Sequence, residues 1–386
     1  MRGAGRWGGA RFDDLQARTS LCFPVPARIL RADRAADVLP VLAAVEEATA
    51  RGSWAYGYVA YEAAAGLDRS LATHHAAGLP LAWFALTGAP STGAPLETAV
   101  CGTYRSRWRP GWDRSGYRSR VQAVRARIAA GDTYQTNLTV RMRGRVEGDL
   151  FAFYRDLALA QHGAGNAYLE LGRYVIASAS PELFFERRAD RVLLRPMKGT
   201  SRRGADAAED RVRAHALRSD AKERAENIMI VDLIRNDIAR LAIAGTVRVP
   251  SLLTVERFGT VLQLTSDVTA TLRPGTGLTA LFTALFPCGS VTGAPKVSTM
   301  ALITELEDTP RGVYCGAIGW VAPPSQPVSM RFAVAIRTAV IDTHDGSAVY
   351  GTGSAITWSS DPDAEHDEIL AKTAILRAGQ RVRGSR

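Results

Sequence analysis

One lysine in this chain stands out for the chemistry it could perform. Lys198 lies in the segment RPMKGT at residues 195–200, at the end of a predicted strand. Lysine and arginine together number 48, yet only four of these residues are lysines. A guanidinium stays protonated and cannot attack carbon, whereas a lysine amine can lose its proton and act as a nucleophile. An ordinary surface lysine explains the hexapeptide equally well, so by itself the segment leaves both interpretations open.

Two pairs of glutamates form a second pattern. Glu223 and Glu226 lie on a long predicted helix, and Glu365 and Glu368 lie in the first turns of the last one. A spacing of three residues puts both carboxylates of a pair on one helical face. Each pair alone is also typical of a solvated acidic face. If the two faces meet, four carboxylates could bind a hard, oxygen-preferring cation such as Mg²⁺.

Three further segments could contact an anion. The small-residue segment 289–295, which contains Ser290, opens a predicted helix whose free N–H groups suit an anion. The glycine-rich segment 351–355 follows a short predicted strand and allows a ligand close to the backbone. Arg337 ends an alternating strand, and a buried arginine there needs an anion such as a carboxylate. The two glycine-rich segments are weak indications when taken alone.

Composition narrows the class of protein. The 386 residues carry a net charge of +10, but the arginines are dispersed and no nucleic-acid-binding motif is present. The charge therefore indicates arginine-rich coding or attraction of a small anionic substrate, rather than a nucleic-acid partner. No apolar run is long enough for a membrane span, and residues 1–14 read as a frayed start without a signal-peptide core. Scattered cysteines suggest neither zinc nor disulfides, so we expect a cytoplasmic protein.

The predicted elements favour an α+β protein rather than a doubly wound sheet, because strands outnumber helices without a βαβ alternation. We expect an N-terminal β-rich subdomain at residues 1–110 and a catalytic domain at 111–386, together forming one compact unit. The predicted strands are 22–30, 55–61, 81–86, 99–104, 134–143, 167–178, 183–188, 192–196, 317–321, 331–339 and 348–350. The predicted helices are 35–50, 117–130, 151–162, 205–241, one that starts near 295, and 361–378.

These patterns occur together, and in the same order, in one known family. From about Trp112 to Leu376 the sequence resembles the chorismate-utilising enzymes, which include anthranilate, aminodeoxychorismate, isochorismate and salicylate synthases. The resemblance implies a large, mainly antiparallel β-sandwich with helices packed outside, as in anthranilate synthase component I. The stretches that carry it are 131–138 (GDTYQTNL), 180–183 (SPEL), 195–200, 226–237 (ENIMIVDLIRND), 289–296, 314–319, 336–338 and 360–368.

The resemblance also implies roles for single residues. Glu226 and Glu368 match the family's Mg²⁺ ligands, and Glu223 and Glu365 match their acidic neighbours. The cation would hold the ring carboxylate of chorismate. The positions that grip the substrate's carboxylates are Arg337, Tyr314, Ser290 and the backbone of Gly353, Ser354 and Ala355.

Two positions indicate the reaction. Gln135 stands where the water-using synthases carry a lysine base, which favours ammonia as the nucleophile. Lys198 stands where anthranilate synthases carry alanine and aminodeoxychorismate synthases carry lysine, so this chain resembles the latter, which make 4-amino-4-deoxychorismate for p-aminobenzoate and folate synthesis. Lys198 would attack C2 and displace the C4 hydroxyl, and ammonia would then add at C4. The alternatives are a C2-aminating anthranilate or aminodeoxyisochorismate synthase and a catalytically silent subunit.

Gln263 is a departure from the family pattern. It replaces a histidine, and an amide can hydrogen-bond a leaving hydroxyl but cannot protonate it. Lys198, Gln263 and Thr200 are therefore the candidate catalytic residues, with the source of the proton unassigned. No Gly-x-Cys-x-Gly elbow is present, so ammonia is expected from a separate glutamine amidotransferase subunit.

Overall fold

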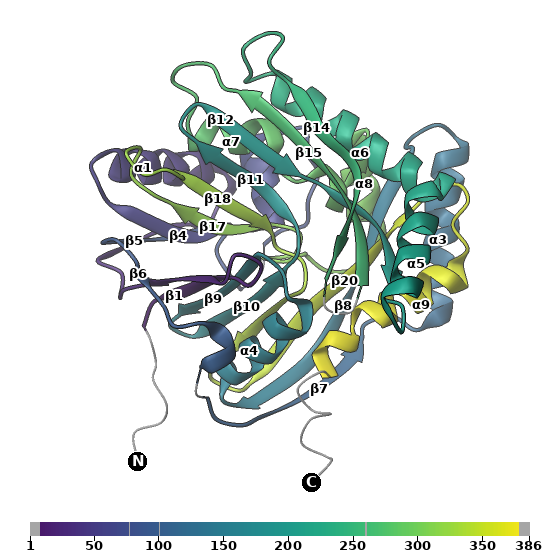
Figure 1. The fold of residues 1–386 in the computed structure, drawn as a ribbon, viewed down its shortest axis with the longest axis horizontal. Coiled ribbons are helices and arrows are strands. Elements are labelled where there is room, and N and C mark those ends of the chain that lie inside the picture. The colour runs from purple at the N-terminus through teal and green to yellow at the C-terminus, as the bar shows by residue number, and fades with distance from the viewer. Residues whose placement is uncertain (1–7, 77, 100, 259–260, 378–386) are drawn as a thin grey trace.

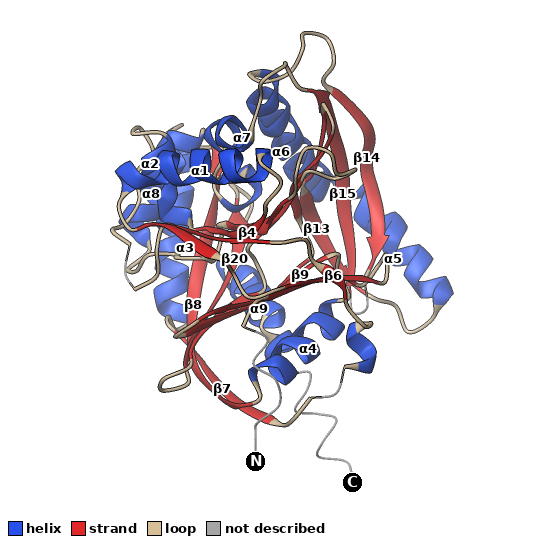
Figure 2. Ribbon diagram, turned by 90° about the vertical axis from the view of Figure 1, so that its left-hand side faces the viewer, coloured by secondary structure: helices blue, strands red, loops and turns tan. Residues whose placement is uncertain are grey.

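Two antiparallel sheets of ten strands each position the candidate residues. The computed structural model describes residues 8–76, 78–99, 101–258 and 261–377, and in these ranges helices pack outside the two facing sheets (Figures 1 and 2). The predicted α+β class, with its mainly antiparallel strands and outer helices, is confirmed. No helix in the described ranges is long and apolar enough to cross a lipid bilayer.

In both sheets, several neighbouring strands come from distant parts of the sequence. Sheet A has the order β16 (Gly293–Ala294), β8 (Gln135–Gly148), β20 (Ser347–Ile356), β19 (Thr338–Asp342), β10 (Tyr174–Ser180), β9 (Gly165–Leu171), β1 (Ala10–Asp14), β2 (Thr19–Phe23) and β6 (Ser91–Thr92), with β7 (Tyr104–Pro110) also paired to β8. Sheet B has the order β13 (Met197–Arg202), β15 (Val261–Thr271), β12 (Arg191–Arg195), β11 (Leu183–Arg188), β18 (Met330–Val334), β17 (Ala317–Val321), β4 (Trp54–Val59), β5 (Ala82–Thr87) and β3 (Arg28–Ala32), with β14 (Arg248–Arg257) paired to β15.

The helices cover the outer faces of the sheets. They are α1 (Val38–Ala50), α2 (Ala64–Leu67), α3 (Arg114–Ala129), α4 (Leu150–Gln161), α5 (Ala207–Ser219), α6 (Ala221–Ala239), α7 (Leu278–Leu285), α8 (Lys296–Leu306) and α9 (Pro362–Lys372). Short 3₁₀ turns are η1 (Ala35–Asp37), η2 (Tyr61–Ala63), η3 (Leu96–Thr98), η4 (Gly289–Val291) and η5 (Ala374–Arg377).

Apolar side chains fill the space between the layers. Tyr56 and Tyr58 of β4 pack with Leu169 and Ile176 of sheet A in a cluster between the two sheets. A larger cluster joins sheet B to α1, α6, α7 and α8, and smaller ones join sheet A to α4 and to α3 with α9. Because strands such as β4 and β5 are buried on both faces, they read as nearly continuous apolar runs. Strands from residues 10–110 join both sheets, and the division into domains stays a prediction.

Several predicted segments are divided in the structure, and each division has a local cause. The predicted helix 205–241 is two helices, because Asp220 accepts a hydrogen bond from Glu223 N and caps α6. The strand predicted at 22–30 is two strands, with Pro24 and Pro26 between them. The strand predicted at 167–178 turns at Gly172, which has a φ of +74°.

Other predictions were wrong in their limits. The start of the chain is not frayed from residue 1 to 14, since Ala10–Asp14 forms β1 between β2 and β9; residues 1–7 lie outside the described ranges. The strand predicted at 99–104 is wrong, because β7 runs from Tyr104 to Pro110. Helix α7 was not predicted at all. The last helix ends at Lys372, and its predicted end at residue 378 lies outside the described ranges.

The helix that carries the second glutamate pair begins where the sequence indicates. Asp361 accepts hydrogen bonds from the backbone N–H groups of Asp363 and Ala364, and Pro362 occupies the first turn. This combination satisfies the exposed N–H groups of a helix start and fixes its first residue. Glu365 is consequently buried against the rest of the protein, while the side chain of Glu368 stays about half exposed.

Candidate active site

Lys198 lies on β13, beside the helix that carries the first glutamate pair. Gly199 follows it with a φ of +92°, and the strand register shifts between Met197 and Thr200. A Cβ atom on Gly199 would stand 3.0 Å from Glu223 Oε2, so the glycine allows this carboxylate to approach the strand. Asn227 of α6 supports the same turn by donating to the carbonyl oxygens of Lys198 and Leu264 at 3.5 and 3.2 Å.

The two glutamate pairs meet, with lysines between and beside them. Lys222 Nζ lies 3.3 Å from Glu365 Oε1 and 4.0 Å from Glu226 Oε1, so it links α6 to α9. Lys372 Nζ lies 2.5 Å from Glu368 Oε1 and donates to the carbonyl oxygen of Gly353 at 2.9 Å. Helices α6 and α9 thus bring Glu226 and Glu365 to one lysine, and ammonium groups neutralise part of this cluster.

Burial, more than the neighbouring carboxylates, raises the pKa values of Glu223 and Glu226 in this cluster. Burial, with the negative charges of Glu226 and Glu368 beside it, raises the pKa of Glu223 to about 7. Burial also raises the pKa of Glu226, against the opposing charges of Lys198 and Lys222. Burial acts on Glu368 in the same direction, but the Lys372 ammonium and its hydrogen bond leave the pKa of Glu368 lowered. The cluster thus holds more negative charge than its lysines compensate.

The chemistry of these side chains fits Mg²⁺, which prefers carboxylate oxygens and water. Among the residues described, no three His, Cys, Asp or Glu side chains are arranged as a ready-made metal site. The raised pKa of Glu223 is the observation that supports the fit, because a divalent cation would stabilise the charged form of this buried carboxylate. Magnesium stays a prediction.

Glu182 is a buried acid that the sequence analysis did not single out as functional. It follows β10 and is only 3% exposed. Burial raises the pKa of its carboxyl to about 7, and a hydrogen bond from Ser290 and the charge of Lys198 partly oppose this rise. Ser290 itself lies on η4, with its Oγ 3.3 Å from Cys288 Sγ. Near neutral pH Glu182 can therefore either donate or accept a proton beside Lys198.

Two glutamines near this region have unused hydrogen-bonding groups. Gln263 on β15 donates to Thr200 Oγ1 at 3.3 Å, while its Oε1 is buried without a partner among the described residues. Gln135 at the start of β8 is fully buried, and neither atom of its amide has a partner in those ranges. Buried polar groups normally have a partner, so such amides indicate a bound molecule or ordered water.

The predicted substrate-gripping residues are placed less uniformly. The strand predicted at 331–339 breaks at Arg337, whose φ is +53°, and its Nη1 donates to the carbonyl oxygen of Lys372 at 2.6 Å. The segment 351–355 was predicted to follow a short strand, but it lies within β20, opposite residues 137–141 of β8. Ser354 Oγ lies 2.9 Å from the hydroxyl of Tyr117, so its backbone rather than its side chain is left for a ligand.

Tyr314 is more buried than a substrate-gripping residue needs to be. Its ring lies directly over Gly351, where a Cβ atom would stand 2.2 Å from the ring. Burial raises the pKa of its hydroxyl well above the ordinary value. Glycine at this position lets the ring pack onto β20. No direct contact joins Tyr314 to Arg337, Ser290 or Lys198 in the described ranges, and its role stays a prediction.

The rarity of lysine in this arginine-rich chain points to more residues of the site than Lys198 alone. Three of the four lysines, Lys198, Lys222 and Lys372, lie in this cluster. The fourth, Lys296, lies at the start of α8 and binds Asp237 of α6 at 3.0 Å. Extending the argument made for Lys198 to all four would have identified Lys222 and Lys372. The burial of Glu182 had no such signal in the sequence.

Comparisons with known proteins show the family to which this chain belongs. The profile of the family described as chorismate binding enzyme matches residues 91–378. Aminodeoxychorismate synthase component 1 of Salmonella typhimurium is 37% identical over 303 residues, which cover 78% of this chain and 64% of that protein. Anthranilate synthase component 1 of Aquifex aeolicus is also 37% identical, over 70% of this chain and 53% of that protein. The chain thus spans less than two thirds of the length of these relatives.

Solved structures show the same fold. Anthranilate synthase component I from Streptococcus pneumoniae superposes with a TM-score of 0.81 at 26% identity, covering 93% of this chain and 92% of that one. A 2,3-dihydroxybenzoate-specific isochorismate synthase from Bacillus anthracis, at 19% identity and a TM-score of 0.78, shares the fold. With a family match over most of its length, this chain belongs to the chorismate-binding enzyme family.

Proposed function

We propose that this chain aminates chorismate at C4, as the chorismate-converting component of an aminodeoxychorismate synthase. The observation that carries the proposal is the position of Lys198, whose charge acts on the carboxyls of Glu182, Glu226 and Glu368. Lys198 would supply the nucleophilic amine, and Glu182, whose carboxyl pKa is raised to about 7, would exchange the proton beside it. The similarity to aminodeoxychorismate synthase component 1 of several bacteria supports this choice.

In the first step, the Lys198 amine attacks C2 of chorismate, both ring double bonds shift by one position, and the C4 hydroxyl leaves. Glu182 supplies the proton that Gln263, which replaces the family's histidine, cannot supply. The hydroxyl therefore departs as water. In the second step, ammonia adds at C4 and the Lys198 amine leaves C2. Glu182 takes the surplus proton from the new amine, which regenerates both residues.

Glu226 and Glu368 would hold Mg²⁺, with Glu223 and Glu365 as acidic neighbours. The ion would neutralise a carboxylate of chorismate when bound. Arg337 and the backbone of residues 353–355 would orient the other carboxylate. The Lys372 ammonium, which bridges Glu368 and Gly353 O, would keep the two binding regions in register.

Ammonia would come from a glutamine amidotransferase subunit. The chain alone is expected to use ammonium salts, with faster turnover at higher pH where more free ammonia is present, and to ignore glutamine. Turnover of glutamine by the purified chain without a partner would contradict this part of the proposal.

A C2-aminating anthranilate synthase is the second candidate, since such enzymes are among the similar relatives and structures. Both candidates are tested by incubating the purified chain with chorismate, Mg²⁺ and ammonium, and identifying the product by mass spectrometry and NMR. We expect 4-amino-4-deoxychorismate. Anthranilate, or a 2-amino product, would overturn C4 amination while leaving the family assignment intact.

A further inference from the structure

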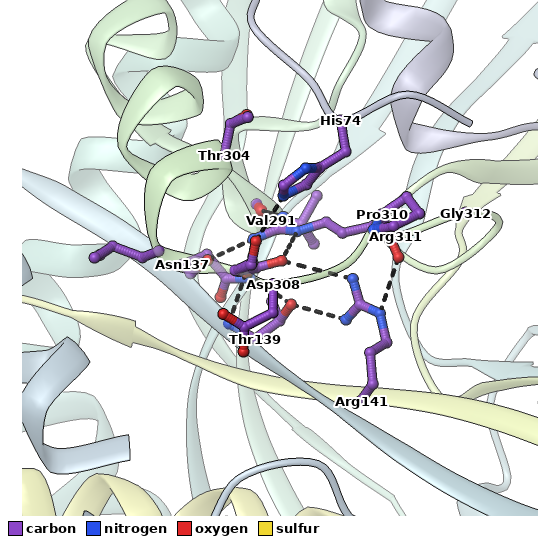
Figure 3. A network of polar contacts seen from close by, with 12 residues as sticks. His74, Asn137, Thr139, Arg141, Val291, Thr304, Asp308, Pro310, Arg311 and Gly312 are labelled. Carbon is purple, nitrogen blue, oxygen red and sulfur yellow. Dashed lines mark hydrogen bonds and ion pairs between the residues drawn. The ribbon is translucent and has the colours of Figure 1, made fainter. Parts of the chain in front are cut away.

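A second polar region lies apart from the cluster around Lys198, where β8 passes the end of α8. Arg141 on β8 and the loop after α8 enclose a cavity of about 130 Å³, lined also by Thr139, Arg143 and Trp112. The volume is several times that needed for a single water molecule. Figure 3 shows the network behind it, in which Arg141 reaches toward Thr139 and the carbonyl oxygen of Pro310.

The carboxylates that line this cavity are already engaged. Glu307 accepts from Arg311 Nη2 and Nε at 2.6 and 3.0 Å, and from the backbone and hydroxyl of Thr139 at 2.9 and 2.8 Å. Asp308 accepts from Trp112 at 2.7 Å and from Arg120 at 2.9 Å. Glu62, which lies behind Arg311, accepts from the N–H groups of Arg311 and Gly312.

The arginines, in contrast, have unused donors. The side chain of Arg141 is 8% exposed, its Nη2 makes no hydrogen bond to the described residues, and the closest carboxylate oxygen, on Glu307, is 3.6 Å away. Arg143, two residues along the same strand, is exposed and has no ion pair among the described residues. The charges of Arg120, Arg141 and Arg311 match those of Glu62, Glu307 and Asp308. Arg143 therefore adds positive charge without a counter-ion.

Further arginines lie on β7, opposite Arg143 and Arg145 of β8. Arg109 pairs directly with Arg143 across the two strands, and Arg107 pairs with Arg145. Like charges directly opposite each other in a sheet are destabilising. Of these residues only Arg145 has an ion-pair partner in the described ranges, Glu147 at 2.7 Å. Repulsion of this kind is relieved when an anion binds between the guanidinium groups.

We propose that this cavity is a binding site for a phosphate-class oxyanion, held by Arg141 from the inside and Arg143 from the rim. Positions two apart on a strand face the same side about 7 Å apart, so two guanidinium groups can bind one anion from different directions. A tetrahedral oxyanion offers three or more acceptor oxygens to such a pair, whereas a carboxylate is satisfied by one arginine. The ligand is free phosphate or the phosphate group of a small metabolite.

Arg143 is the residue to test, because it is exposed and outside the buried Glu307–Arg311 network. The purified full chain would be titrated calorimetrically with inorganic phosphate at constant ionic strength. We expect saturable 1:1 binding that Arg143→Gln weakens about tenfold, the effect of losing a charge-assisted hydrogen bond. The matched control is Arg145→Gln, which removes an exposed arginine from the same strand face outside the cavity and should change affinity less than about twofold.

Parallel titrations distinguish the source and the class of ligand. Binding of phenyl phosphate as tightly as inorganic phosphate would indicate the phosphate group of a metabolite, and weaker binding would indicate free phosphate. Tighter binding of acetate or succinate would overturn the ligand class. In crystals soaked with selenate, anomalous diffraction should place selenium beside Arg141 and Arg143. No saturable binding, selenate only elsewhere, or equal losses in both arginine variants would overturn the site; equal losses would indicate a diffuse polyanion-binding surface.

Discussion

The two polar regions of this protein differ in how their charges are matched. Around Arg311 three arginines face three carboxylates, and Arg311 also donates to the carbonyl oxygens of Val291 and Asn137 (Figure 3). Around Lys198 three lysines face five carboxylates, from Glu182, Glu223, Glu226, Glu365 and Glu368. Two of these five carboxyls have pKa values raised to about 7.

The difference indicates which region performs chemistry. The charge-balanced network around Arg311 fixes the turn at η4 and the start of β8, and its carboxylates are held by hydrogen bonds instead of being groups poised to exchange a proton. An unbalanced cluster has such groups and has room for the charge of a cation or substrate. The balanced network would therefore support the unbalanced one, by holding the segment that carries Ser290. The following variants test this division.

The largest effect is expected at Lys198. Lys198→Ala should lower C4 amination by about a thousandfold or more, because the covalent route is removed. Lys198→Arg should be no better, since it keeps the charge but cannot attack carbon. Both variants should still bind chorismate, as measured by calorimetry. Wild-type formation of the 4-amino product by Lys198→Arg would show that the lysine acts only through its charge.

Glu182→Gln should reduce turnover by about a hundredfold or more, as expected for loss of a general acid. The wild-type enzyme needs the protonated carboxyl, so its rate at a fixed concentration of free ammonia should fall as pH rises through about 7. The variant should lack this decrease. An unchanged pH profile in Glu182→Gln would assign the proton to another group.

Arg311→Met should damage stability rather than chemistry. It leaves Glu307 buried without its main partner, and loss of one member of a buried pair costs about 3–5 kcal/mol. Urea unfolding should show this loss. Arg51→Met is the control, because Arg51 and Glu47 form an exposed pair on α1, worth less than about 1 kcal/mol. Equal costs in the two variants would contradict the supporting role of the network.

The smallest effect concerns magnesium and pH. Glu223 has a raised pKa, so its contribution to stability is present at low pH and is lost as pH rises through about 7. Mg²⁺ should therefore raise the melting temperature more at pH 8 than at pH 6, by about 2–4 °C.

Two substitutions separate a specific magnesium site from general salt effects. Glu226→Gln should remove the stabilisation by Mg²⁺. Lys222→Met should strengthen Mg²⁺ binding, because it removes the ammonium that now contacts Glu226 and Glu365. Equal melting shifts in the wild type and Glu226→Gln would argue against a magnesium site at these glutamates.

Part of this site could be predicted because its signals are local. The Asp361-Pro362 start fixes α9, and a three-residue spacing puts each glutamate pair on one face. Whether the two faces meet is decided by the packing of α6 on β13 and of α9 on β20. No local sequence pattern contains this information, which came from the family resemblance.

The parts that could not be predicted depend on three-dimensional surroundings. The burial of Glu182, and with it the raised pKa of its carboxyl, results from sheet packing around η4. The positive φ of Arg337 interrupts a stretch whose apolar alternation is that of one continuous strand. The glycines of residues 351–355 indicated a ligand-contacting segment beyond a short strand, yet these glycines serve the close packing of Tyr314 and β8 on β20.

The most direct test of the central claim is the covalent state of Lys198 during turnover. The chain would be mixed with chorismate and Mg²⁺ without ammonia, quenched, digested and examined by peptide mass spectrometry. We predict an adduct of chorismate less one water on the peptide that contains Lys198, which disappears when ammonium is added before quenching. Formation of 4-amino-4-deoxychorismate at the full rate, with no adduct on Lys198 at any time, would contradict the account.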